Sequence, residues 1–371
     1  MKSTQCTLKK VCAVLVVVIM ALGLVSVNAV YDEATVIAAE DGSIDTIYNL
    51  TGKYLSDNNK TISYGNGKEG YLLGLSRAAY PVDAGLYSGY YDSVRSYLAS
   101  NGGQFDSVTE CAKVVTVLNA IGYDPTNIDS VDISTQLEDA DNVSGVWGYA
   151  YTLIGLDSKN YPSNHRELYI SKLLEAQLDS GAWGWDGETE DIDTTGMVLA
   201  SLAPYYNNNA TVHEAVDNAI NYLSDVQMED GTFSSFGTKN SNTTAMVVLG
   251  LSELGIDADS DARFVKGGIS AVDALGSFAV EGGGFGWDNN TEINDYATYQ
   301  SYYALNSYYR QQKGMRRLFD MTPEQESNSG SNAVSEDAAV TDVARETTDA
   351  AESNQKVAKA PKTGDKWLLV F

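Results

Sequence analysis

Carboxylates and tryptophans gather in two loops of similar sequence, and these are the first candidates for chemistry. One loop runs over 184–191 and contains Trp185 and Asp191, and the other runs over 286–292 and contains Trp287. Calcium binding is conceivable, because Ca²⁺ takes several carboxylate and carbonyl oxygens as ligands. Neither loop has the EF-hand pattern, and a solvated acidic loop has the same composition. We therefore predict no metal site.

A pair of carboxylates, Asp191 and Asp193, stands at the start of an uncharged stretch that we expect to be helical. In other copies of the repeat described below, Asn242 and Thr109 occupy the position of Asp193. Asp, Asn and Thr all accept hydrogen bonds from the first free amides of a helix, and a carboxylate there suits the helix dipole. Helix capping alone therefore explains Asp193, and no catalytic role is needed.

Thiol and imidazole groups are scarce. Cys111 is the only cysteine left if the first 29 residues are removed, and the two histidines, His165 and His213, have no metal-site spacing. A zinc site built on cysteines is excluded by this set, and we expect no cofactor.

The first 29 residues have the pattern of a signal peptide. Lysines precede the uncharged apolar run 11–25, and 27–29 supplies a small-residue cleavage site. The run is shorter than the ~20 residues that a membrane span needs. We therefore predict a secreted or cell-surface protein with no stable membrane anchor in this chain.

The other end has a different composition. Residues 321–360 are polar and poor in large apolar side chains, which predicts a disordered stalk. Residues 361–371 begin with Pro361, Thr363 and Gly364, which resemble the P-x-T-G core of a sortase sorting signal and imply a sortase substrate joined to the cell wall. The hydrophobic span of that signal is missing. Either the chain is a truncated piece of a wall-anchored protein or the match is accidental.

The charge of the chain disfavours two classes of partner. The formal net charge is −26, and loss of the three lysines of the signal peptide would lower it to −29. Such a surface repels phosphate backbones and anionic lipid headgroups. We therefore expect no nucleic-acid partner.

A repeat of about 50 residues positions these candidates. Three segments, 177–183, 227–233 and 279–285, fit the frame Q-x-x-x-G-x-aromatic, the last with Ala in place of Gln. A second block, 191–202, aligns without gaps to 240–251. The motif residues to which we assign a structural role are Gln177, Gly181, Trp183, Gln227, Gly231, Phe233, Gly283 and Phe285. A period of this length that holds two helical patterns predicts one helical hairpin per repeat.

The two helices of each hairpin differ in kind. The helix before each Q motif is amphipathic, whereas the helix after it has almost no charge, which predicts an outer and an inner shell. The outer/inner pairs fall near 44–79, 87–121, 129–156, 164–206, 212–254 and 266–313. No polar capping repeat covers the ends of an open stack, so the pairs are expected to close on themselves. We predict an all-α fold over residues 30–320, an (α/α)6 toroid of six hairpins.

The repeat resembles the prenyltransferase and squalene-cyclase repeat family, the terpenoid cyclase superfamily. The segments 177–183 and 227–233 match its QW motif in full. The chain is also similar to exported bacterial repeat proteins that resemble the helical domain of cobalamin carriers. The resemblance implies the same toroid but leaves function open, because its members include enzymes and non-catalytic carriers.

The resemblance implies one catalytic alternative. Class II cyclases carry a D-x-D-D motif at the start of an inner helix, and its middle Asp protonates an alkene. Here Asp193 would be that acid and Asp191 a partner that tunes it, with Thr194 in place of the third acid. Corrinoid binding is a second alternative, weakened because no β domain follows.

Our preferred hypothesis is binding without catalysis. Aromatic and polar residues on or beside inner helices are candidates to line a central cavity. These candidates are Trp147, Tyr149, Trp185, Trp287, Tyr296, Tyr299 and Gln300. We expect an exported, wall-attached toroid that binds a small apolar or aromatic ligand, or a partner protein at the cell surface.

Overall fold

The structure is a computed structural model that describes residues 42–323. The predicted signal peptide, nearly all of the stalk, and the sorting residues Pro361, Thr363 and Gly364 lie outside the described residues. The all-α fold class is confirmed. The strands of the described part are two short antiparallel hairpins, β1 (Ser234–Ser235) with β2 (Thr238–Lys239) and β3 (Val265–Lys266) with β4 (Ile269–Ser270).

Outer and inner helices alternate along the chain. The inner helices are α4 (Glu69–Arg77), α6 (Val108–Ala120), α7 (Gly145–Asp157), α9 (Ile192–Leu202), α11 (Ser241–Glu253) and α13 (Asp295–Gln312). The outer helices are α3 (Ile44–Asn58), α5 (Leu86–Ser100), α8 (Arg166–Glu175), α10 (Ala210–Val226) and α12 (Ala271–Gly276). Short 3₁₀ turns are η1 (Ile133–Glu138), η2 (Ala140–Asn142), η3 (Ala203–Tyr205) and η4 (Ala262–Phe264).

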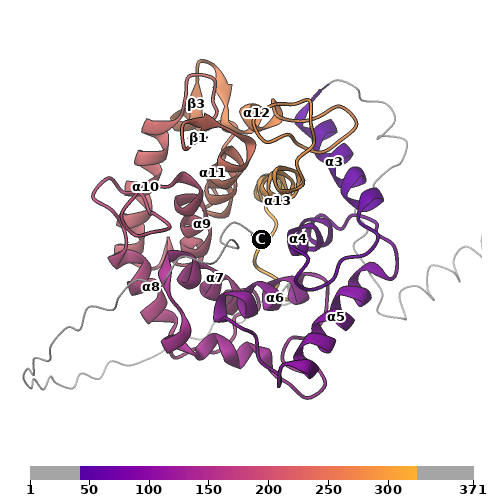
Figure 1. Ribbon diagram of the computed structural model, residues 1–371. Helices are drawn as coiled ribbons and strands as arrows, with labels where there is room; N and C mark the ends of the chain where they lie inside the picture. Colours follow the sequence, from indigo (N-terminus) through magenta and orange to yellow (C-terminus); the bar gives the residue numbers. More distant parts are fainter. Residues whose placement is uncertain (1–41, 324–371) are drawn as a thin grey trace, which may run out of the picture. The chain divides into compact units, whose positions relative to one another are not determined.

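The inner helices pack in a closed order. α4 packs on α6, α6 on α7, α7 on α9, α9 on α11, α11 on α13, and α13 again on α4. Figure 1 shows these helices around a common centre, with the outer helices outside them. The uncharged stretches are therefore covered on all sides, as a helix that is apolar all round requires.

The inner helices all run in one direction. Side chains join their first turns, as where Trp147 Nε1 donates to Thr194 Oγ1 at 3.0 Å and Lys68 lies 3.6 Å from Asp295. Their last turns also meet each other. Asn119 Nδ2, near the end of α6, donates to Ser158 Oγ, just after α7, at 2.8 Å. We call the side on which the inner helices begin the N-terminal face, and the opposite side the C-terminal face.

Close approach of α9 and α11 depends on glycine. A Cβ placed on Gly196 would overlap the carbonyl oxygen of Met246, and one on Gly250 would lie 2.8 Å from the carbonyl oxygen of Gly196. The two helices therefore meet at their backbones, which a side chain at either position would prevent.

The Q motif joins successive repeats. Gln177 Nε2 donates to the carbonyls of Gly181 at 2.8 Å and Ala215 at 2.7 Å, and Ala215 belongs to the next outer helix. Gln227 makes the equivalent pair of bonds. Gly181 has a φ of +91°, a conformation that favours glycine. The motif aromatics Trp183, Phe233 and Phe285 are fully buried.

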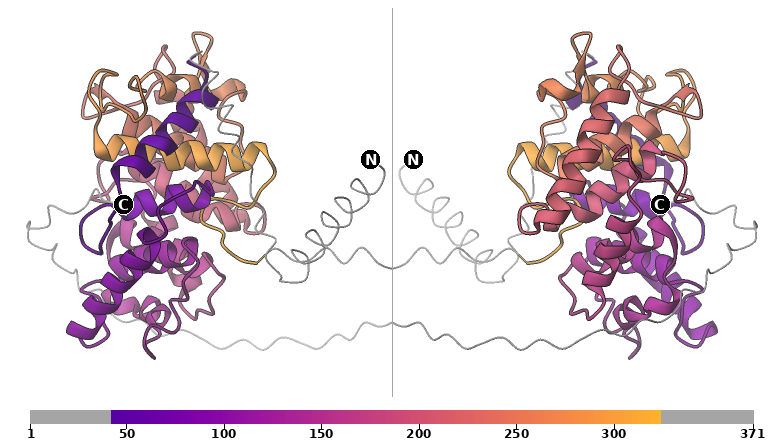
Figure 2. Two further views of the ribbon diagram at one scale, coloured as in Figure 1. Left: turned by 90° about the vertical axis from the view of Figure 1, so that its right-hand side faces the viewer. Right: turned by 90° about the vertical axis from the view of Figure 1, so that its left-hand side faces the viewer.

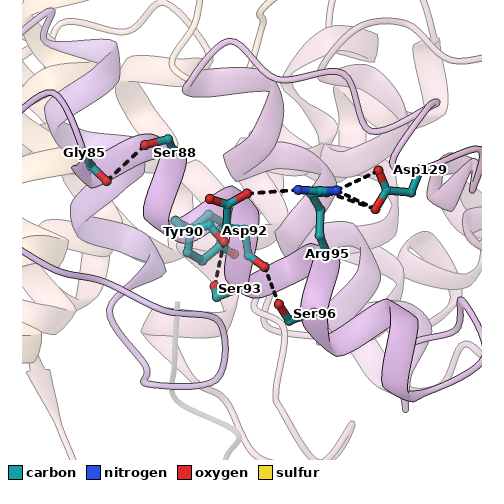
Figure 3. Close-up of polar contacts among 8 residues, drawn as sticks. All are labelled: Gly85, Ser88, Tyr90, Asp92, Ser93, Arg95, Ser96 and Asp129. Atoms are coloured by element: carbon teal, nitrogen blue, oxygen red, sulfur yellow. Dashed lines mark hydrogen bonds and ion pairs between the residues drawn. The ribbon is translucent and has the colours of Figure 1, made fainter.

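The third outer element differs from the prediction. The outer helix expected in the first part of the pair 129–156 is replaced by the 3₁₀ turns η1 and η2. Asp129 and Ser130 adopt positive φ values of 50° and 72°, which break a right-handed helix. Arg95 of α5 forms a bidentate ion pair with Asp129 at this bend. Arg95 Nε lies 3.0 Å from Asp129 Oδ2, and Nη2 lies 2.9 Å from Oδ1 (Figure 3). The last outer helix, α12, is also shorter than expected.

The segment 313–322 covers the C-terminal face. The Leu318 amide donates to Glu253 Oε1 at 2.8 Å, and the Met321 amide donates to the Ser158 carbonyl at 2.7 Å. Leu318 is fully buried. In Figure 2 this yellow segment follows α13 at the end away from the loops that precede that helix.

Candidate functional site

Asp191, and not Asp193, caps α9. The Thr194 amide donates to Asp191 Oδ1 at 2.7 Å. The equivalent residues Asn240 and Asn294 cap α11 and α13 in the same way. The expectation that Asp193 caps the helix is therefore wrong, because the cap lies two residues earlier in each repeat. Asp193 is the second residue of α9, and capping does not explain it.

Asp193 faces the neighbouring inner helix. Its Oδ1 is buried without a hydrogen-bond partner, although the residue as a whole is partly exposed. Burial raises the pKa of Asp193 to about 7, the charge of Asp191 raises it further, and the hydroxyl of Thr243 lowers it. A carboxyl in this state is half-protonated near neutral pH and is a weak acid.

Asp193 belongs to a central polar cluster, which we define as Asp193, Asn242, Gln300 and Tyr303. Asn242 Nδ2 donates to Gln300 Oε1, while Asn242 Oδ1 is buried without a partner. Tyr303 is buried, its hydroxyl lies 3.3 Å from the Met246 sulfur, and burial together with the charge of Asp193 raises its pKa. The cluster therefore contains one buried acceptor atom, Asn242 Oδ1, that no donor of the described residues satisfies, and a carboxylate, Asp193, with only the Thr243 hydroxyl beside it.

A lysine lies on the other side of the centre. Lys113 Nζ lies 4.6 Å from the ring centroid of Tyr151, which suits a cation–π contact. Burial lowers the pKa of Lys113 to about 8, and the charges of Glu110 and Glu69 oppose that change. Burial also raises the pKa of Glu69. Charged and polar groups therefore lie on this side of the centre as well.

Three of the predicted cavity residues pack into the folded interior. Tyr299 is buried and stacks edge-on against Tyr71, with ring centroids 5.2 Å apart. Trp147 donates to Thr194, as described above. Tyr149 packs beside Tyr169 of the outer helix α8, with centroids 6.1 Å apart. These rings contribute to packing between helices. Gln300 bonds to Asn242 in the central polar cluster.

The other predicted aromatics lie exposed on the N-terminal face. Trp185 is 51% exposed, Trp287 43% and Tyr296 42%. The sequence analysis missed a fourth ring, Phe236, which is 90% exposed at the tip of the β1–β2 hairpin. The repeat contains a signal for it: Phe236 follows the buried Phe233 as Trp185 follows Trp183, with one extra residue between them.

The loops that present the two tryptophans share a rigid turn. In the loop 184–191, Asp186 Oδ1 accepts from the backbone amides of Glu188 at 2.9 Å and Thr189 at 2.8 Å. In the loop 286–294, Asn289 Oδ1 accepts in the same manner from the amides of residues 291 and 292. Ser241 Oγ also donates to the Gly286 carbonyl at 2.7 Å and fixes the second loop to the start of α11. The rings therefore stand on defined backbones.

The same loops are strongly acidic. Their exposed carboxylates are Asp186, Glu188, Glu190, Asp288 and Glu292. Within 42–323, no lysine, arginine or histidine forms an ion pair with any of them. Lys239 and Lys68 are engaged with other carboxylates, Lys239 with Asp230 at 2.7 Å and Lys68 with Asp295.

Metal and membrane sites find no support in the described part. No group of three or more His, Cys, Asp or Glu residues among 42–323 is arranged to hold a metal ion. None of the helices described there is both long and apolar enough to span a bilayer.

No known family model matches the chain, and no curated protein is significantly similar to it. The resemblance to the prenyltransferase and squalene-cyclase repeat therefore rests on the motif residues themselves.

Proposed function

We propose that the chain is an exported, wall-attached α/α toroid that binds a partner protein through its N-terminal face, without catalysis. The observation that carries the proposal is the placement of the exposed rings. Loops that precede three successive inner helices, α9, α11 and α13, each present an exposed aromatic side chain on one side of the ring. Exposed aromatic rings on rigid loops are typical of protein-binding surfaces.

The closed packing order supports the toroid in this proposal. Each inner helix contacts the next, and α13 contacts α4, and five of the six expected outer helices alternate with the inner helices in the predicted order. The third outer position is occupied by 3₁₀ turns, which preserves the order of the pairs.

The packing of the centre favours a protein partner over a small ligand. Tyr151, Met246 and Tyr299 are buried, and they lie near the central polar cluster on three inner helices. Side chains that are already packed against each other offer little apolar surface to a small guest. A partner protein that binds to the outside of the ring requires no opening between these side chains.

The chemistry of Asp193 argues against the cyclase alternative. Protonation of an alkene requires a strong acid, and the pKa of Asp193 is raised to about 7. Burial and the charge of Asp191 both weaken it as a proton donor. The D-x-D-D pattern also lacks its third acid. Thr194 stands at that position and accepts a hydrogen bond from Trp147.

The exit of the chain suits attachment at one end and binding at the other. Residues 313–322 lie on the C-terminal face, and the predicted stalk follows them. A wall bond at Thr363 would therefore leave the N-terminal face on the side of the ring opposite the point of exit.

Site-specific photocrosslinking on the producing cells tests the proposal. The full chain would carry a photoreactive phenylalanine analogue at position 236 on the N-terminal face, or at position 168 on α8 as the control, since Leu168 is also exposed. We expect a recurrent crosslinked protein band from position 236 alone, which excess purified chain removes and which Trp185→Ala with Trp287→Ala abolishes. Equal bands from both positions, or none from position 236, would overturn the proposal.

A further inference from the structure

The carboxylates of the N-terminal face form no ion pairs within the described residues, and this indicates which kind of protein the face would bind. Asp186, Glu188, Glu190, Asp288 and Glu292 are exposed and form no ion pair with a lysine, arginine or histidine of the described residues. Like charges gathered on one surface repel each other until a cation approaches. The face therefore has an electrostatic preference that the rest of the described chain does not meet.

The exposed aromatic rings also favour a cationic partner. Trp185 and Trp287 stand on the acidic loops, and Phe236 stands on the β1–β2 hairpin of the same face. The face of an aromatic ring attracts ammonium and guanidinium groups, and tryptophan is the strongest of the three ring types. A cation that approaches the carboxylates therefore also finds ring faces beside them.

A third observation lies behind this rim. Asn242 Oδ1, close to the start of α11, is a buried acceptor without a donor, and Asp193, close to the start of α9, has only the Thr243 hydroxyl beside its carboxylate. Unsatisfied acceptors favour a ligand that brings hydrogen-bond donors. Lysine and arginine side chains carry only donors.

We propose that the partner of the N-terminal face is a protein that presents an extended segment rich in lysine or arginine. The inference rests on the proposed function and names the chemistry of its partner. The rings come from three successive repeats, so they are spread along the face and are not gathered into a cage for one small cation. Packed helices lie about 8–10 Å apart, and an extended chain advances about 3.3 Å per residue. One basic residue in about every three therefore matches the spacing of the loops.

Titration of the full chain with a synthetic peptide tests this inference. The probe is a twelve-residue Gly/Ser peptide with lysine at every third position, and binding is followed by calorimetry and tryptophan emission. Trp185 and Trp287 are exposed, while Trp183 is buried, so contact with the face alters the emission of the first two. We expect binding that weakens as salt rises, because exposed charges are screened. The same peptide with glutamate in place of lysine is expected not to bind.

Matched charge variants locate the site. Glu188→Gln, Asp288→Asn and Glu292→Gln together neutralise three carboxylates of the face, and all three are exposed. Glu167→Gln, Glu214→Gln and Asp225→Asn neutralise three exposed carboxylates on the outer helices α8 and α10 and change the net charge equally. We expect the first set to weaken binding about tenfold and the second to change it less than about twofold. Equal losses in both sets, or binding of the glutamate peptide, would overturn the inference.

The two proposals fail separately. If position 236 crosslinks to a surface protein but the lysine peptide does not bind, the face binds a partner of another chemistry and only the inference is lost. If the peptide binds but no crosslink forms on cells, the acidic surface binds cationic peptides nonspecifically, and the proposed function is lost.

Discussion

Glu253 and Leu318 are joined across the C-terminal face, where the Leu318 amide donates to Glu253 Oε1 at 2.8 Å. Glu253 ends the inner helix α11 and is buried, and Ser307 of α13 donates to the same oxygen. One carboxylate therefore connects two inner helices to the segment that follows α13. Burial raises its pKa, and these donors together with the charges of Arg317 and Arg77 oppose that change.

Removal of this carboxylate should loosen the C-terminal segment. Glu253→Ala leaves the Leu318 amide and the Ser307 hydroxyl without their acceptor, so we expect the free energy of unfolding to fall by about 2–4 kcal/mol. Chemical denaturation measures the loss, and limited proteolysis should cut near residues 313–322 sooner than in the wild type. Glu167→Ala, on the exposed side of α8, is the control and should change stability by less than about 0.5 kcal/mol. An equal effect of both variants would contradict this account of Glu253.

Asp193 should make stability depend on pH. Its pKa is about 7 in the folded chain and near 3.8 in the unfolded one, so the folded state binds the proton more tightly. Its stabilising contribution is then fully present below about pH 4 and is lost as the pH rises to about 7. Asp193→Asn cannot ionise. The free energy of unfolding of the wild type, relative to that of Asp193→Asn, should fall by on the order of 2–4 kcal/mol between pH 4 and pH 8.

Urea denaturation of both proteins at a series of pH values measures this difference. The comparison cancels other buried acids whose pKa is raised, such as Glu253 and Asp157, because both proteins contain them. A difference that stays constant over this pH range would show that Asp193 titrates as in an unfolded chain.

Two glycines in helices should respond oppositely to alanine. At Gly196 a Cβ would overlap the Met246 carbonyl, so Gly196→Ala should separate α9 from α11 and lower the free energy of unfolding by about 2–4 kcal/mol. At Gly89, on the exposed side of α5, no atom lies within 4 Å of the added Cβ. Gly89→Ala should therefore raise stability by about 0.5–1 kcal/mol. Thermal denaturation of the two variants, which carry the same chemical change, compares them directly.

The order of outer and inner helices could be predicted from the sequence, because amphipathic helices and uncharged helices differ in the spacing of their polar residues. The inner helix of the pair predicted over 129–156 is observed as α7, Gly145–Asp157, which ends within one residue of the predicted end of that pair. The third outer helix failed because Asp129 and Ser130 turn the chain with positive φ values, and there Asp129 pairs with Arg95, 34 residues earlier. A pattern within one segment cannot reveal such a partner.

The site was predicted in part, for reasons that lie in the repeat. Trp185 and Trp287 stood out because their loops match each other. Phe236 was missed because its loop is a β-hairpin with one extra residue. Asp193 was assigned as a cap because Asp, Asn and Thr suit that role, but Asp191, Asn240 and Asn294 fit it equally well. Only the hydrogen bonds distinguish the two positions.

Incubation with a polyprenoid tests the proposal that the chain has no cyclase activity. The raised pKa of Asp193 makes it too weak an acid to protonate an alkene, so the wild-type chain and Asp193→Asn should both leave squalene unchanged. Gas chromatography of the extracted lipid detects cyclised products. Turnover by the wild type that Asp193→Asn abolishes would restore the cyclase alternative, because Asn has nearly the shape of Asp but cannot donate the proton. Circular dichroism of both proteins supplies that control.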